Sequence, residues 1–218
     1  MAITNYGELI ADAKRYAKRS GLTDLDRFVQ LAEMRIMYGS GDENDQLFTE
    51  PVRLQSMVVE GDITIAAAAT EATLPSGFLE FAESPYISGT RSTPLEVITG
   101  ANRILRSPSL PTEQPTEYAI VGNKMKFNAT ADQAYTIPAT YYALTALTEA
   151  ADTNELLTAR PDIYLHAILI EIGLFTMSQT AISQALTQYK GSVSGAERYE
   201  NKRRYKGTLV MKSDGGTP

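Results

Sequence analysis

The feature that most constrains this chain is the segment Ile163–Phe175, which is apolar nearly all round at helical spacing. Only His166, Glu171 and Gly173 interrupt it. Pro161 precedes it, and the first turn of a helix tolerates a residue that lacks an N–H group. A helix without a polar face has to be covered on most of its sides. The chain has 218 residues, enough to do this alone, but contact with a neighbouring subunit would cover the helix more easily.

Two further helices are expected near the N-terminus. Asn5 and Glu8 have the spacing of an N-cap residue and its reciprocal partner three residues later, which predicts a helix over residues 5–19. A second apolar stripe predicts a helix that ends at Gly39. Because the turn between the two helices is so short, we expect them to pack against each other as an αα-hairpin.

A last helix is predicted from residue 181 to residue 206, with an apolar stripe along one side. Gly191 and Gly195 weaken its middle by about 1 kcal/mol each relative to alanine, so we expect a kink or a break there. Beyond this helix, Thr208–Met211 is strand-like and isolated. It is either a disordered end or an arm that adds to the sheet of a neighbouring chain.

Between the two helical regions the apolar residues recur every second position in short runs separated by Pro and Gly. Val121–Lys124 has the chemistry of a two-residue hairpin turn, and Leu105–Thr116, with its three prolines, reads as a surface loop. The predicted fold class is α+β and mainly α, a helical bundle formed from the N- and C-terminal helices with an inserted antiparallel β subdomain. The expected domains are an N-terminal helical hairpin over 1–50, the β subdomain over 51–145, the C-terminal helices over 146–206 and an extended arm over 207–218.

The sequence offers little for catalysis. It has no cysteine and one histidine, His166, which lies in the apolar helix and reads as a core or interface residue. Gly191–Gly195 resembles a nucleophile elbow, but Val193 stands where the serine should be. Asp42 and Asp45 lie in a polar loop that misses the EF-hand spacing. We therefore predict no enzyme activity, no cofactor and no metal site.

Charge and length narrow the choice of partners. The net charge is −6, yet residues 182–218 hold seven basic and three acidic side chains. Such a segment reads as a solvated helix face, a contact for an acidic protein, or a nucleic-acid site over residues 198–206. The apolar helix is too short for a membrane span, which needs roughly 20 residues. The predicted interface residues are Arg198, Lys202, Arg203, Arg204, Tyr205, Lys206, Leu209, Val210 and Met211.

Four segments together form a pattern that resembles a known family. They are TDLDRFVQLAEMRI (Thr23–Ile36), ATLPSGFLEF (Ala72–Phe81), EYAIVGNKMKFN (Glu117–Asn128) and YYALTALTEAADTNELLTARPDIYLHAILIEIG (Tyr141–Gly173). The pattern is similar to the head-to-tail adaptor, or connector, proteins of tailed bacteriophages of the podophage type. The chain departs from it at Asn128, where the family often has proline, and at Glu155, where it tends to have an aromatic residue.

The resemblance implies a structural virion protein that is made in the host cytoplasm and sits at the portal vertex, in the neck of the particle. It implies a homo-oligomeric ring of twelve subunits that joins the portal protein to the tail or nozzle proteins. Genomic DNA would pass through the channel without specific binding, and the C-terminal segment would reach the portal. The alternatives left open are another tail component, such as a tail-tube or nozzle subunit, and a nucleic-acid-binding protein.

Overall fold

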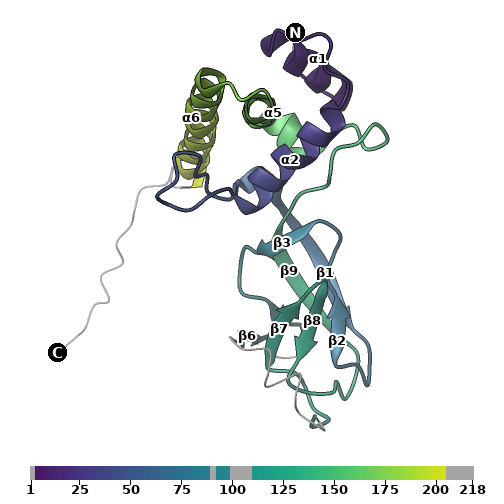
Figure 1. The fold of residues 1–218 in the computed structure, drawn as a ribbon. Coiled ribbons are helices and arrows are strands. Elements are labelled where there is room, and N and C mark those ends of the chain that lie inside the picture. The colour runs from purple at the N-terminus through teal and green to yellow at the C-terminus, as the bar shows by residue number, and fades with distance from the viewer. Residues whose placement is uncertain (1–2, 89–91, 99–109, 205–218) are drawn as a thin grey trace, which may run out of the picture. The chain divides into compact units, whose positions relative to one another are not determined.

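The structure, a computed structural model, describes residues 3–88, 92–98 and 110–204 (Figure 1). The chain divides into two compact units. The helical unit comprises Met1–Ser56 and Ala146–Pro218, and the β unit comprises Met57–Thr145. The prediction of an α+β fold, with a helical bundle built from both ends of the chain and a β subdomain inserted between them, is confirmed.

The helical unit is organised around α5 (Pro161–Phe175), which begins at the predicted proline. Its neighbours are α1 (Tyr6–Tyr16), α2 (Leu25–Tyr38), α4 (Glu155–Ala159) and α6 (Gln179–Arg204), and all four contact it. Side chains from every side of α5 are buried, among them Ile163, Leu165 and Ile168. The chain therefore covers its apolar helix with its own helices, so this helix is not by itself evidence for a subunit interface.

The first helix begins as predicted, with one difference in the cap. The Asn5 side chain accepts a hydrogen bond from the Glu8 N–H group at 2.9 Å. The Glu8 carboxylate reaches back to Thr4, where it accepts from both the N–H group and the hydroxyl at 2.7 Å. The helix ends at Tyr16, earlier than predicted, because the chain turns at Lys18, whose φ is 53°.

The predicted αα-hairpin between the first two helices is wrong. An antiparallel hairpin would place the first turn of α1 beside the last turn of α2. Instead, the Tyr6 hydroxyl in the first turn of α1 donates to Asp26 in the first turn of α2, at 2.7 Å. Both helices pack mainly on α5 rather than along each other. The apolar α5 offers each of them more apolar surface to cover than the other helix does.

Of the kink or break predicted in the last helix, the break is wrong, since α6 is one continuous helix of 26 residues. The glycine penalty is small compared with the packing of the buried stripe on α5. At the start of α6 the two helices approach closely. A Cβ on Gly173 would lie 3.0 Å from Cγ1 of Ile182 and 3.2 Å from its backbone nitrogen.

The β unit contains two larger sheets and a short pair. Its strands are β1 (Val58–Ile65), β2 (Glu71–Thr73), β3 (Phe78–Phe81), β4 (Tyr86–Ile87), β5 (Thr93–Pro94), β6 (Glu96–Val97), β7 (Glu117–Val121), β8 (Lys124–Phe127) and β9 (Tyr135–Ala143). The strand orders are β1-β9-β3, β2-β8-β7-β6 and β4-β5. Their inner faces form one apolar core that includes Ile63, Phe127 and Ile137.

The predicted hairpin is confirmed, because Val121 pairs with Lys124 across a two-residue turn that begins at Gly122, with φ at 63°. One pair departs from the antiparallel expectation. β6 and β7 run parallel, which requires a crossover connection rather than a tight turn. Of the loop predicted over residues 105–116, residues 110–116 are described, and they form only an isolated bridge from Thr112 to Thr130. Residues 105–109 and the predicted arm over 207–218 lie outside the described residues.

Gly39 allows a test of whether the backbone conformation at the end of α2 requires glycine. It ends α2 with φ at 73° and ψ at −171°, and a Cβ there would collide with the carbonyl oxygen of Thr49. We expect Gly39→Ala to lower the free energy of unfolding by about 1–3 kcal/mol, because this backbone region is strained for other residues. Chemical denaturation followed by helical circular dichroism measures it.

Gly191→Ala is the matched control. A Cβ at Gly191 meets nothing within 4 Å, so this change should raise the stability of the isolated chain by up to about 1 kcal/mol. Equal effects of the two substitutions would contradict our interpretation of Gly39.

Candidate functional site

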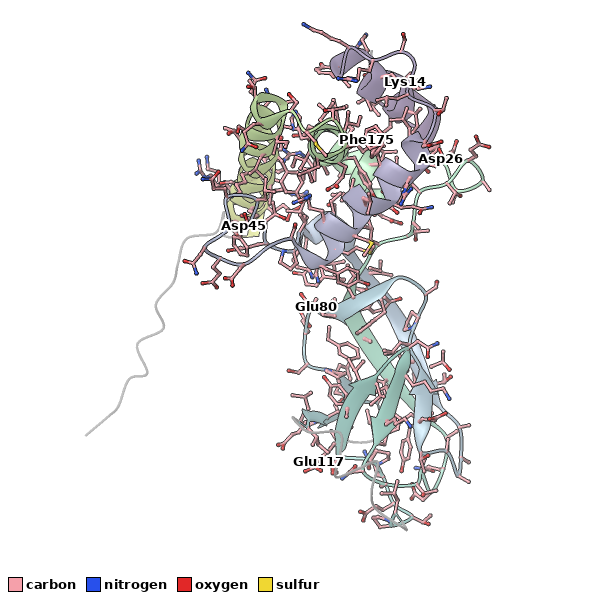
Figure 2. The ribbon with its side chains drawn as sticks, in the orientation of Figure 1. Lys14, Asp26, Asp45, Glu80, Glu117 and Phe175 are labelled. Atoms are coloured by element: carbon pink, nitrogen blue, oxygen red, sulfur yellow. The ribbon has the colours of Figure 1, made fainter. Side chains whose placement is uncertain are left out.

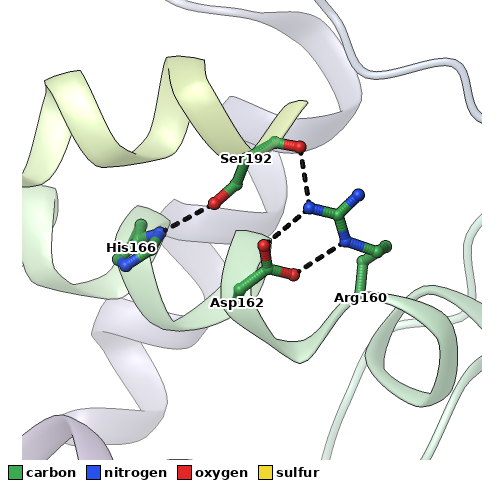
Figure 3. A network of polar contacts seen from close by, with 4 residues as sticks. All are labelled: Arg160, Asp162, His166 and Ser192. Carbon is green, nitrogen blue, oxygen red and sulfur yellow. Dashed lines mark hydrogen bonds and ion pairs between the residues drawn. The ribbon is translucent and has the colours of Figure 1, made fainter. Parts of the chain in front are cut away.

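The arrangement most like a catalytic site is a polar network between the start of α5 and the middle of α6 (Figure 3). Arg160 donates to both carboxylate oxygens of Asp162, at 2.9 and 2.7 Å, and to the backbone carbonyl of Ser192 at 2.8 Å. Nδ1 of His166 lies 3.2 Å from the Ser192 hydroxyl. Three neighbouring residues at the start of α5 thus meet Ser192, which lies far from them in the sequence.

The geometry of this network is that of a structural clamp rather than of a Ser-His-Asp triad. In a triad the carboxylate orients the imidazole from the nitrogen that faces away from the serine. Here both oxygens of Asp162 bond Arg160, and hydrogen bonds from Arg160 and Ser192 hold the pKa of Asp162 below its usual value. Partial burial lowers the pKa of His166, which favours the neutral ring. As expected, His166 is a packed residue with a hydrogen-bond partner.

Two charged residues of α2 point into the helical unit, and the sequence analysis missed both. Nε of Arg35 donates to Glu171 of α5 at 2.8 Å, and both side chains are buried. Nη1 of Arg35 also lies 3.4 Å from the carbonyl oxygen of Leu47. Glu171 was the available signal, because an acid in an otherwise apolar helix requires a buried cation.

Glu33, the other inward charge of α2, holds the segment that enters the helical unit from the β unit. Its carboxylate accepts from the Leu147 N–H group at 2.7 Å and lies 3.4 Å from the Tyr164 hydroxyl. That hydroxyl accepts from the Asn154 side chain at 2.7 Å. Burial raises the pKa of Glu33, and the two hydrogen bonds to its carboxylate only partly oppose that rise.

The predicted interface residues are only partly described. Arg198, Lys202 and Arg203 are exposed along the second half of α6, and within the described chain none of them forms an ion pair. Arg204 belongs to the helix, but its side chain is not described. Tyr205, Lys206, Leu209, Val210 and Met211 lie outside the described residues. Glu200, which lies among these basic residues, accepts from the Gln55 N–H group at 2.6 Å.

A row of exposed apolar side chains follows the outer face of α2, and the sequence analysis did not single it out. Leu31, Met34 and Tyr38 are 41%, 54% and 67% exposed and recur at helical spacing. Phe175, which Figure 2 labels at the end of α5, extends the row. Its ring packs edge-on against Phe28 of α2, with centroids 5.4 Å apart.

A cavity of about 630 Å³ lies beside this row, lined by residues 21–24 and by side chains from α2 and the end of α5. Large exposed apolar side chains grouped together typically mark a protein interaction surface. We call Leu31, Met34, Tyr38 and Phe175 the α2 surface. It is the strongest candidate for a contact with another protein that the described residues offer.

The outer face of α6 has the opposite character, because it carries Gly191 and Gly195 and, further along, exposed basic side chains. A Cβ built at Gly191 or Gly195 meets nothing within 4 Å. A cavity of about 320 Å³ lies between residues 48–51 and another side of α6, where Tyr189, Val193 and Glu197 are among its lining residues. The hydroxyls of Thr49 and Tyr189, both buried, line it and have no hydrogen-bond partner in the described chain.

Other kinds of site find no support in the described residues. Within 3–88, 92–98 and 110–204, no group of three His, Cys, Asp or Glu side chains is placed to hold a metal ion. Asp45 of the polar loop accepts a hydrogen bond from the Leu47 N–H group at 2.9 Å. Among the helices of the described chain, none is long and apolar enough to cross a membrane.

Comparison with protein families gives a match over nearly the whole chain. The family model described as SU10 adaptor protein matches residues 4–212, which is nearly the whole chain. No curated protein matches the chain. The matched range covers both the helical unit and the β unit.

Glu33 gives a pH-dependent test of the helical unit. Its pKa in the folded chain lies above the ordinary value of 4.5, so folding favours its protonated form. Relative to Glu33→Gln, the wild type should therefore gain stability as the pH falls from the folded pKa towards 4.5, and gain nothing further below it. Glutamine keeps the accepting oxygen that the Leu147 N–H group needs.

Denaturation of both proteins across this pH range, with the difference in unfolding free energy as readout, makes the measurement. Glu43→Gln, in the exposed loop after α2, is the control and should show no such trend. A difference between wild type and Glu33→Gln that does not change with pH would contradict the buried, high-pKa assignment.

Proposed function

We propose that this protein, which belongs to the SU10 adaptor protein family, is the head-to-tail adaptor of a tailed phage. In this proposal the structural phage adaptor forms a ring that joins the portal to the tail and continues the DNA channel. The observation that carries the proposal is the family match over residues 4–212. A ring of twelve subunits at the portal vertex, assembled in the host cytoplasm, is the arrangement we expect.

The structure supports the proposal through the surfaces that the helical unit leaves open. A chain that covers α5 with its own helices has a complete core, so the α2 surface is not needed for folding. Its large side chains remain exposed nonetheless. In a structural protein that works in an assembly, such a surface is explained by a protein partner.

The basic side of α6 supports a second contact. Arg198, Lys202 and Arg203 are exposed on a chain whose net charge is −6. They are available to an acidic protein surface, which is how we assign them in the adaptor. The arm over residues 207–218 remains our prediction for the segment that reaches the portal.

Nucleic-acid binding is the alternative that these same three residues favour, because Tyr199 lies among them with its ring 64% exposed. Basic side chains with an interleaved aromatic ring suit single strands. In the adaptor proposal these residues contact protein, so the chain should not shift single- or double-stranded DNA at low salt. A shift that weakens steeply with salt would favour the alternative.

The main prediction concerns the molar mass of the complex that the chain forms with the portal protein. We expect light scattering to show a portal complex carrying a full ring when the chain is mixed with the portal protein of the same genome. Two faces suited to protein contact should give assembly without any other component. The chain alone and the portal alone are the controls. A chain that stays a monomer beside the portal would contradict the adaptor proposal and favour a tail-tube or nozzle subunit.

A further inference from the structure

We infer that the cavity between residues 48–51 and α6, which we call the α6 cavity, receives basic side chains from the next copy of the chain in the ring. These side chains belong to residues 14–19, which we call the α1 end. The inference rests on the proposed function, because it identifies two surfaces of the chain that meet in the ring. The occupant of the α6 cavity is therefore a second copy of this chain.

Two residues that line the α6 cavity carry polar groups that the chain leaves unsatisfied. Thr49 and Tyr189 are 3% and 2% exposed, and their hydroxyls have no hydrogen-bond partner in the described chain. A buried hydroxyl without a partner is costly, so these two groups point to something that completes them. Hydroxyl oxygens accept hydrogen bonds, and the charged groups of lysine and arginine carry only donors. A basic side chain therefore fits this place.

The surroundings of the α6 cavity are acidic. Glu50 and Glu197 are exposed and line it, and the loop just before it carries three more exposed acids over residues 42–45. Within the described chain none of these acids forms an ion pair. Lys190, also exposed, is a basic lining residue and offsets one of them. The remaining negative charge favours a positively charged partner.

The α1 end has the opposite charge. It contains Lys14, Arg15, Lys18 and Arg19, of which the last three are exposed. Arg15 pairs with Asp12 at 3.0 Å, whereas Lys18 and Arg19 form no ion pair within the described residues. The dipole of α1 favours cations at this end, but that attraction leaves their charged groups in solvent. They are available to carboxylates of another chain.

The two surfaces lie on opposite sides of α6. The α1 end lies on one side, where Arg19 lines a cavity together with Gln188. Glu197 lines the α6 cavity and follows Gln188 by nine residues, which is about two and a half turns of an α-helix. Figure 2 labels Lys14 on α1 and Asp45 on the acidic loop, well apart in the helical unit. A contact between two such different surfaces is heterologous, and repeating it produces a ring when the rotation closes.

The basic side chains of α6 itself are the other source of cations in the described chain. Glu197 and Arg198 are neighbours in the sequence, so acid and base share one region there. Two copies that joined through this shared region would form a two-fold pair, which stops at a dimer. The α1 end lies on the other side of α6, so its contact leaves a free surface at each end and can continue around a ring.

Two charge-reversed variants test the contact by mixing. Lys18→Glu with Arg19→Glu makes both surfaces acidic, and Glu50→Lys with Glu197→Lys makes both of them basic. Each variant alone should lose the ring on the portal in light scattering at low salt, because every contact then joins like charges. An equimolar mixture should assemble again, since a ring in which the two variants alternate joins opposite charges at every contact. A ring of twelve is even and permits this alternation.

The matched control is Glu149→Lys with Glu155→Lys. It makes the same change of charge at exposed positions that line neither cavity, and it should assemble alone. Circular dichroism of each variant checks that it folds. Assembly of either reversed variant alone, or a mixture of the folded variants that forms no ring, would overturn the inference.

Tyr189→Phe provides a second readout. It keeps the aromatic ring in place and removes a hydroxyl that lacks a partner, so the chain alone should unfold at the same or a higher denaturant concentration. Ring formation should nevertheless weaken about tenfold, because a hydrogen bond from a charged donor is lost. Assembly as tight as that of the wild type would contradict the entry of a basic side chain into the α6 cavity.

These experiments separate the inference from the proposed function. If the wild type assembles but reversed charges do not prevent assembly, or mixing does not restore it, the ring stands and our assignment of its surfaces is wrong. If the wild type forms no ring with or without the portal, the proposed function fails, and the inference fails with it. Loss of the ring in each variant and its return on mixing support both.

Discussion

The helical unit depends on one constraint, the need to cover α5 on every side. Because α5 has no polar face, each helix around it must present its own apolar stripe to it, and α1, α2, α4 and α6 all do so. The single acid in its second half, Glu171, adds an electrostatic condition. A buried carboxylate without a partner is costly, and Arg35 of α2 meets that need. The position of α2 is thereby set by packing and by charge together.

This arrangement changes which part of the chain supports an assembly. An apolar helix at a subunit interface would make the fold of each copy depend on its neighbours. Here α5 is covered within one chain, and the surfaces left over are the outer faces of α2 and α6. The bulky side chains lie on one and the small ones on the other. Assembly would then add contacts to a finished unit rather than complete an unfinished core.

Local signals predicted the parts of the fold that local chemistry decides. Asn5 caps α1, Pro161 opens α5 and Gly122 forms the hairpin turn, because each of these depends on residues a few positions away. The inward charges of α2 were not predictable in this way. Arg35 and its partner Glu171 are 136 positions apart. A prediction from the apolar stripe of a helix also places every charged residue on the solvent side. The exposed row on α2 was missed because it lies outside the apolar stripe that predicted the helix, and such a stripe gives no signal for a second, exposed apolar face.

The predicted break in α6 illustrates how tertiary packing overrides propensity. Each glycine costs about 1 kcal/mol in an isolated helix. In the folded chain, however, Ile182 and Tyr189 of α6 are buried, and Arg160 donates a hydrogen bond to the carbonyl oxygen of Ser192. Those contacts keep the helix continuous through a segment that is intrinsically weak. A helix stabilised from one side can keep glycines on the other side, where a Cβ would meet nothing within 4 Å. The inner face of α6 therefore carries the fold, and the glycines lie where they cost the packing nothing.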